Sequence, residues 1–85
     1  MNGNGATQSE RIVDVREIAP RIRHTVIHQL FENLQAEQWL QLIVDHDPRR
    51  LKRQLEAGFG AHVGWDYLES GPDVWRVRIC RGRPA

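Results

Sequence analysis

The first patterned part of the chain is a run of β-branched residues that is followed by a stretch of helical periodicity. Residues 11–15 are rich in β-branched side chains and contain no Gly or Pro, which is typical of a strand. A connection follows at 16–20. Apolar residues at helical spacing then predict a helix over 21–35, with Ile27 and Phe31 on its inner face.

The next segment repeats this order in a shorter form. Residues 39–44 are almost continuously apolar, as expected for an interior strand covered by helices. A short helix is predicted over 48–57, with Leu55 facing inward. Gly58 and Gly60 are expected to end it.

The last segment has the period of two that strands show. Apolar residues alternate over 62–68 and again over 74–80, and the residues 70–73 between them read Ser-Gly-Pro-Asp, a turn composition. These two strands form an antiparallel hairpin. Arg76 and Arg78 fall on the outer face of the second strand.

The resulting element order is β-α-β-α-β-β. A β-α-β unit requires a right-handed crossover and parallel strands. We therefore predict an α+β two-layer sandwich, a four-stranded mixed sheet with two helices on one face. The single domain is expected over 11–80, between disordered tails at 1–10 and 81–85, which lack apolar runs.

Composition narrows the class of protein. The 85 residues carry 12 Lys or Arg and 11 Asp or Glu, a formal net charge of +1, so the basic run at 49–53 is interpreted as a solvated helix face and nucleic-acid binding is not favoured. No apolar run approaches the ~20 residues of a membrane span. No secretory signal pattern is present, and Cys80 is the single cysteine, so we expect a cytoplasmic protein without an intramolecular disulfide.

Charged side chains are expected to gather where the two parallel strands end, the edge at which open α/β sheets bind ligands. The candidate residues of this edge are Arg16, Arg23, His24, Asp45, His46 and Asp47.

Three interpretations of this edge stay open. In the structural one, Asp47 caps the second helix ahead of Pro48, and Asp45 pairs with Arg16 or Arg23.

The other two interpretations are functional. In the second, a metal ion is held by a set drawn from His24, His28, His46 and Asp45. In the third, Arg16, Arg23 and Arg49 bind an anion or a partner peptide together with the helix N-termini.

The remaining reactive or aromatic side chains are assigned structural roles. Trp39, Trp65 and Trp75 are expected to be core or half-buried sheet residues. Cys80 is expected to be a buried, inert thiol, because no base lies near it in sequence.

Taken together, these motifs resemble a bacterial domain of unknown function, family number 2249, over residues 12–81. The residues that carry the resemblance are Asp14-x-Arg16, Pro20, Arg23-His24-x-x-Ile27, Asp45-His46-Asp47-Pro48 with Leu51 and Gln54, Trp65, and Gly71-Pro72-x-x-Trp75-x-Val77-x-Ile79. The sequence departs from the family pattern at Glu17, where Gly is more usual, and at Ala36-Glu37, where a Pro-Gly turn is more usual.

The resemblance implies a fold similar to the TusA/SirA sulfur carriers. Those proteins place a persulfide-forming Cys before a Pro at the first helix, whereas residues 18–22 here contain no Cys. Members of the resembled family are often fused to, or encoded near, hemerythrin-like and nitrogen-oxide-related proteins. The resemblance therefore implies a protein partner linked to redox chemistry. We predict a non-enzymatic accessory or binding module that requires no cofactor; the alternatives are sulfur transfer through Cys80 and metal binding through His24, His46 and Asp45.

Overall fold

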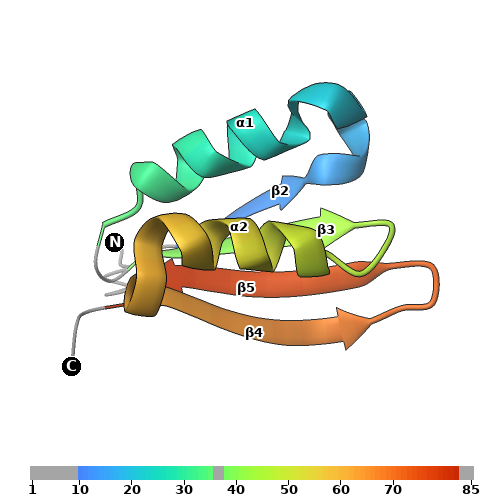
Figure 1. Ribbon diagram of the computed structural model, residues 1–85. Helices are drawn as coiled ribbons and strands as arrows, with labels where there is room; N and C mark the ends of the chain where they lie inside the picture. The colour runs from blue at the N-terminus through green and yellow to red at the C-terminus, as the bar shows by residue number, and fades with distance from the viewer. Residues whose placement is uncertain (1–9, 36–37, 83–85) are drawn as a thin grey trace, which may run out of the picture.

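The structure, a computed structural model, describes residues 10–35 and 38–82. The elements in chain order are β2 (Glu10–Asp14), η1 (Val15–Glu17), α1 (Pro20–Glu32), β3 (Trp39–Val44), α2 (Arg49–Phe59), η2 (Gly60–His62), β4 (Val63–Ser70) and β5 (Trp75–Arg81). The strands form one sheet in the order β2-β3-β5-β4 (Figure 1). β2 and β3 are parallel, and β5 is antiparallel to both of its neighbours. The predicted β-α-β-α-β-β sandwich is confirmed.

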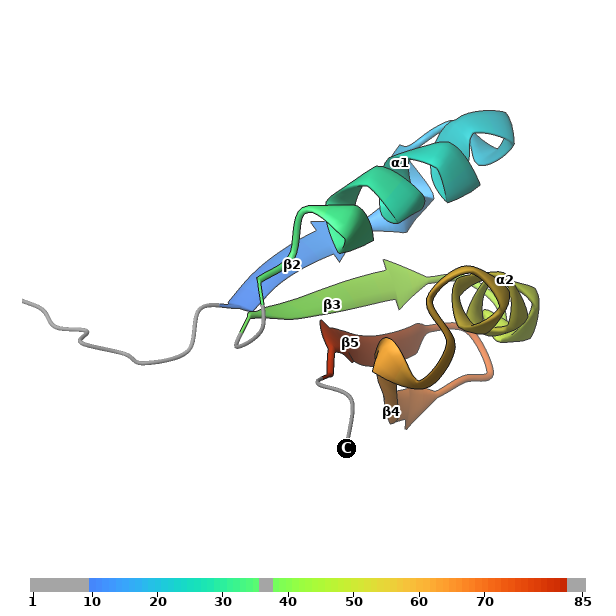
Figure 2. The same cartoon turned by 60° about the vertical axis from the view of Figure 1, so that its left-hand side comes forward.

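Both helices cover the same face of the sheet, α1 over the β2 side and α2 over the β5 and β4 side (Figure 2). Alternate residues of the strands point toward them, because successive side chains of a strand face opposite sides. The buried residues form one hydrophobic cluster. Its members are Val15, Ile27, Phe31, Leu40, Leu42, Val44, Leu51, Leu55, Val77 and Ile79.

The first strand and the first helix both end earlier than predicted. Val15 leaves the strand for a 3-10 turn, because the Asp14 carboxylate accepts a hydrogen bond from the backbone N–H of Arg16 at 3.1 Å. α1 begins at Pro20 and ends at Glu32 rather than at residue 35. Asn33 ends it, its side-chain amide donating to the Gln29 carbonyl at 2.9 Å.

The second helix runs further than predicted. Gly58 lies inside α2, and the chain leaves the helix only at Gly60, whose φ of 62° favours glycine. The extra turn lets Phe59 pack edge-on against Phe31, with ring centroids 4.8 Å apart. Aromatic burial therefore extends the helix past a residue that by itself signals an end.

The bounds of the domain also shift by one residue at each end. Glu10 is the first residue of β2, and Arg81 is the last residue of β5, where it donates to the Glu32 carbonyl at 2.8 Å. The rest of the two predicted tails lies outside the described residues, apart from Gly82. Among the described residues, no helix is long and apolar enough to cross a membrane.

The opposite face of the sheet carries long polar side chains. The Arg78 guanidinium lies 4.4 Å from the ring centroid of Trp39 and within 3.2 Å of a Glu10 carboxylate oxygen. Gln41, only 8% exposed, donates to Glu10 at 2.9 Å and accepts from Arg76 at 3.3 Å. The prediction that Arg76 and Arg78 occupy the outer face is confirmed.

Candidate functional site: a pocket at the ends of the parallel strands

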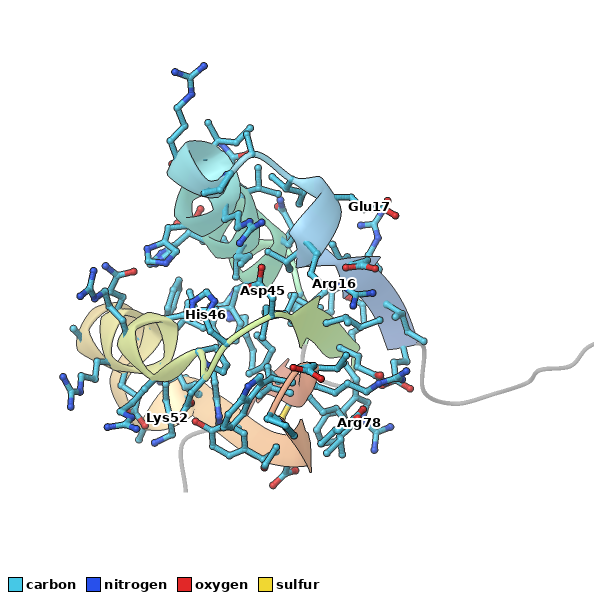
Figure 3. The ribbon with its side chains drawn as sticks, turned by 90° about the vertical axis from the view of Figure 1, so that its right-hand side faces the viewer. Arg16, Glu17, Asp45, His46, Lys52 and Arg78 are labelled. Atoms are coloured by element: carbon cyan, nitrogen blue, oxygen red, sulfur yellow. The ribbon has the colours of Figure 1, made fainter. Side chains whose placement is uncertain are left out.

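A pocket of about 400 Å³ opens where β2 and β3 end and where the two helices begin. Because β2 and β3 are parallel, the segments that follow them meet at one edge of the sheet, and Figure 3 views this edge with Arg16, Asp45 and His46 labelled. The pocket is lined by Val15, Arg23, His24, Ile27, Val44, His46, Asp47, Pro48, Arg50 and Leu51. Four of the six predicted edge residues therefore line it.

Arg23 is a largely buried charged side chain of the pocket. Its side chain is only 15% exposed. Nε donates to the Ile18 carbonyl at 2.8 Å and Nη2 reaches the Arg16 carbonyl at 3.4 Å. Nη1 lies 3.8 Å from an Asp45 carboxylate oxygen, beyond hydrogen-bond distance. The guanidinium is thus oriented by the backbone and keeps donor capacity at Nη1.

Asp45 pairs mainly with its neighbour in sequence. Nδ1 of His46 lies 2.7 Å from Oδ1 of Asp45 and acts as the donor, since a carboxylate only accepts. This bond, with a smaller contribution from the Arg23 charge, lowers the pKa of Asp45 below the ordinary value. The expected pairing of Asp45 with Arg23 is present, but it is the longer of the two contacts.

The prediction that Asp47 caps the second helix is wrong. Pro48 precedes the first turn of α2, and no side chain caps that turn. The two Asp47 carboxylate oxygens instead accept from the Tyr67 hydroxyl at 2.8 Å and from Arg49 at 3.3 Å. Tyr67 lies on β4, twenty residues away, so a tertiary contact replaces the local one. Desolvation and this contact raise the pKa of Tyr67.

Three other candidate residues stand apart from the pocket. Arg16 binds Asp14 through two hydrogen bonds of 2.8 and 2.7 Å, which lowers the pKa of Asp14. Arg49 is paired with Asp47, and its neighbour Arg50 lines the pocket instead. His28 lies further along α1, in a shallower groove.

The predicted metal ligands are not gathered into one set. His24 and His46 line the pocket, Asp45 is bound to His46, and His28 lines the neighbouring groove. Within residues 10–35 and 38–82, no three His, Cys, Asp or Glu side chains are placed to hold a metal ion.

Cys80 lies at the other end of the strands. It pairs in register with Trp39, the first residue of β3, whereas the pocket adjoins Val44, the last. Burial raises the pKa of its thiol, and the Asp66 carboxylate acts in the same direction. The thiolate, which is the nucleophilic form, is therefore disfavoured at this position.

Sequence reasoning missed the apolar floor of the pocket, one of its polar residues, and a contact made by another. Val15, Ile27, Val44 and Leu51 form the floor, although periodicity alone marks such residues only as core. Arg50 belongs to the basic run interpreted from the sequence as a solvated helix face. It is the second residue of α2, and this position close to Pro48 at the start of the helix could have indicated that it lines the pocket. No local pattern indicates the contact of Tyr67 with Asp47.

Comparison with known proteins identifies a family without a described activity. The model of the family described as "Uncharacterized conserved protein (DUF2249)" matches residues 12–81, and the chain belongs to this family. No curated protein matches the chain. No solved structure matches it either.

Proposed function

We propose that this DUF2249 protein is a non-enzymatic module that binds a small organic anion, a carboxylate attached to an apolar group, in the pocket between α1 and α2. The observation that carries the proposal is Arg23. Its guanidinium is largely buried, and backbone carbonyls accept hydrogen bonds from Nε and Nη2. Among the described residues, the nearest acidic oxygen to Nη1 is that of Asp45, at 3.8 Å. An oriented arginine of this kind suits a carboxylate, because a hydrogen bond from its charged Nη1 to an anionic oxygen is roughly twice as strong as one between neutral groups.

The pocket has the size and lining of a small-molecule site. Its volume of about 400 Å³ falls within the range of roughly 300–1,000 Å³ that ligand pockets occupy. Its floor consists of the aliphatic side chains of Val15, Ile27, Val44 and Leu51. An apolar group placed there leaves water, and the carboxylate of the same ligand then lies at the polar rim.

The charges at the rim favour a negative ligand. Arg23 and Arg50 are permanently cationic, and His24 carries an imidazole N–H group, whereas the Nδ1–H of His46 is already donated to Asp45. Asp47 is the single acidic side chain of the lining, and both of its oxygens already accept hydrogen bonds from Tyr67 and Arg49. Asp45 lies 3.8 Å from Nη1 of Arg23, but the same oxygen of Asp45 already accepts from His46, so a ligand carboxylate would compete only with this longer contact.

The uncapped start of α2 adds to this preference. Pro48 is the N-cap residue and Leu51 lies in the first turn, whose early backbone N–H groups have no partner within the helix. That turn contains no acidic residue and no side-chain cap. The positive end of the helix dipole thus adjoins the pocket, and the nearby Asp47 carboxylate already accepts hydrogen bonds from Tyr67 and Arg49.

The position of Cys80 supports a binding role over sulfur transfer. Persulfide chemistry needs an accessible thiolate close to the ligand. Cys80 is partly buried, its pKa is raised, and it sits at the opposite end of β5 from the pocket. The hemerythrin-like or redox partner implied by the resemblance stays a prediction.

Titration of hexanoate and benzoate, followed by the methyl NMR signals of Val15, Ile27, Val44 and Leu51, tests the proposal. We expect saturable shifts with the acids and not with hexanamide or benzamide. Arg23→Gln should weaken binding by about 10- to 100-fold, the equivalent of losing a charge-assisted hydrogen bond. Arg53→Gln, which removes an exposed arginine of α2 outside the pocket, is the matched control.

Arg50→Gln serves as a second variant, because Arg23 also ties α1 to the preceding turn and its loss affects folding. Its effect on hexanoate should be a weakening of a few-fold, as for a more exposed charge. Equal binding of acids and amides, or unchanged affinity in both arginine variants, would overturn the proposal.

A further inference from the structure

We infer that the anion taken by this pocket is the C-terminal carboxylate of a polypeptide, bound with its last residues extended along the groove between α1 and α2. This inference rests on the proposed function and names its ligand class. Its starting point is a second groove of about 470 Å³ that meets the pocket at His24, which lines both. Together the two hollows have a lining that extends beyond the pocket along both helices.

The walls of the second groove continue those of the first. On α1 the lining passes from His24 to His28, one turn further along. On α2 it passes from Arg50 and Leu51 to Gln54, again one turn on. A four-residue step in a helix advances about 6 Å, which matches about two residues of extended peptide.

The chemistry of the second groove suits a peptide backbone. Its lining consists of His24, Thr25, His28, Gln29 and Gln54. Each of these side chains carries both a hydrogen-bond donor and an acceptor, and none has a permanent charge. Peptide groups offer donors and acceptors in alternation, so they can satisfy this lining. A hydrocarbon chain in the same place would cover these polar groups without replacing the hydrogen bonds that they make with water.

The direction of the peptide follows from the position of the charges. Arg23 and Arg50 are at the pocket end of the groove, where the terminal carboxylate is then bound. The side chain of the last residue enters the aliphatic floor formed by Ile27, Val44 and Leu51. The preceding one or two residues lie across the second groove. Capture of a chain terminus with pockets for its side chains is a known mode of peptide recognition.

Three synthetic probes test the inference by NMR titration: acetyl-Leu with a free carboxylate, acetyl-Ala-Ala-Leu with a free carboxylate, and the same tripeptide as its amide. The free tripeptide should bind about tenfold more tightly than acetyl-Leu, as one or two additional hydrogen bonds would give. The tripeptide amide should bind at least about tenfold more weakly than the tripeptide with a free carboxylate. Gln54→Ala should remove the advantage of the tripeptide and leave acetyl-Leu unaffected.

Gln35→Ala, which truncates an exposed glutamine outside both hollows, is the matched control and should change neither affinity. If acetyl-Leu binds through Arg23 but the tripeptide binds no more tightly, the inference fails and the proposed function stands. Tighter binding of decanoate than hexanoate without a gain for the tripeptide likewise overturns the inference alone. If no carboxylate binds, both the inference and the proposed function fail.

Discussion

Replacing Gly64 with alanine should destabilise the protein because of one side chain, the thiol of Cys80. The two residues face each other across the β4–β5 pair. A methyl carbon on residue 64 would lie 2.6 Å from the sulfur of Cys80. That is about 1 Å closer than an ordinary nonbonded contact of roughly 3.5–4.0 Å. The sulfur or the strand must therefore move.

The size of the effect follows from two opposing contributions. Overpacking of a well-filled site costs about 1–3 kcal/mol. Alanine also restricts the unfolded chain, which returns about 0.4–1 kcal/mol. We expect Gly64→Ala to lower the free energy of unfolding by about 1–2 kcal/mol. In a Cys80→Ala background the sulfur is gone, and the same substitution should be neutral or stabilising by up to about 1 kcal/mol.

Urea unfolding followed by tryptophan fluorescence measures both values. With an m-value of about 1 kcal/mol/M, the loss in the parent background corresponds to a midpoint shift of about 1–2 M. Gly58→Ala is the control, because nothing lies within 4 Å of an added carbon there and the residue is inside α2. It should stabilise by about 0.8–1 kcal/mol. An equal loss on Gly64→Ala in both cysteine backgrounds would refute the steric argument.

Four further outcomes are expected. Leu55→Ala should lower the free energy of unfolding by about 2–5 kcal/mol, because Leu55 is fully buried, and a loss below about 1 kcal/mol would contradict the core assignment. The pKa of Asp14 is lowered by its hydrogen bond from Arg16, so the stability it contributes is present above the ordinary aspartate value of 3.8 and is lost as the pH falls below it. Acid unfolding of Asp14→Asn should therefore be less steep than that of the parent, and superimposable curves would refute this. Tyr67→Phe removes the hydrogen bond to Asp47 and should lower the free energy of unfolding, measured by thermal unfolding, by about 0.5–1.5 kcal/mol. An absorbance titration of the parent should show the Tyr67 phenol ionising above pH 10, because its pKa is raised. Cys80 should react with iodoacetamide more slowly at neutral pH in the folded protein than in urea, because burial raises its pKa; equal rates would contradict the burial.

Most of the fold could be predicted from the sequence because short-range regularities specify it. The helical spacing of Ile27 and Phe31 selects the buried face of α1, and the apolar run of β3 marks a strand covered by helices. The alternation of Val77 and Ile79 with arginines predicts which face of β5 is buried. In each case the pattern of burial has the same period as the backbone.

Element ends depend on contacts that periodicity does not contain. The sequence predicts a stop at Gly58, but the packing of Phe59 on Phe31 extends α2 as far as Gly60. The 3-10 turn at Val15 forms because the Asp14 carboxylate accepts a hydrogen bond from the backbone N–H of Arg16. A local helix-stop or strand signal changes the free energy by about 1 kcal/mol, so a single aromatic contact or hydrogen bond reverses it.

For the candidate site, too, one part could be predicted from the sequence and another part depends on tertiary contacts. The sequence by itself determined which charged residues follow the parallel strands, and therefore that Arg23, His24 and His46 meet at one edge. Only the tertiary structure decided what each of them does there. It orients Arg23 by backbone carbonyls and turns Asp47 from a local helix cap into the partner of Tyr67, twenty residues away. Sequence spacing fixes the edge on which a side chain lies, because strand direction and helix period are local properties. Hydrogen-bond partners are decided by distances that exist only after distant segments have packed together.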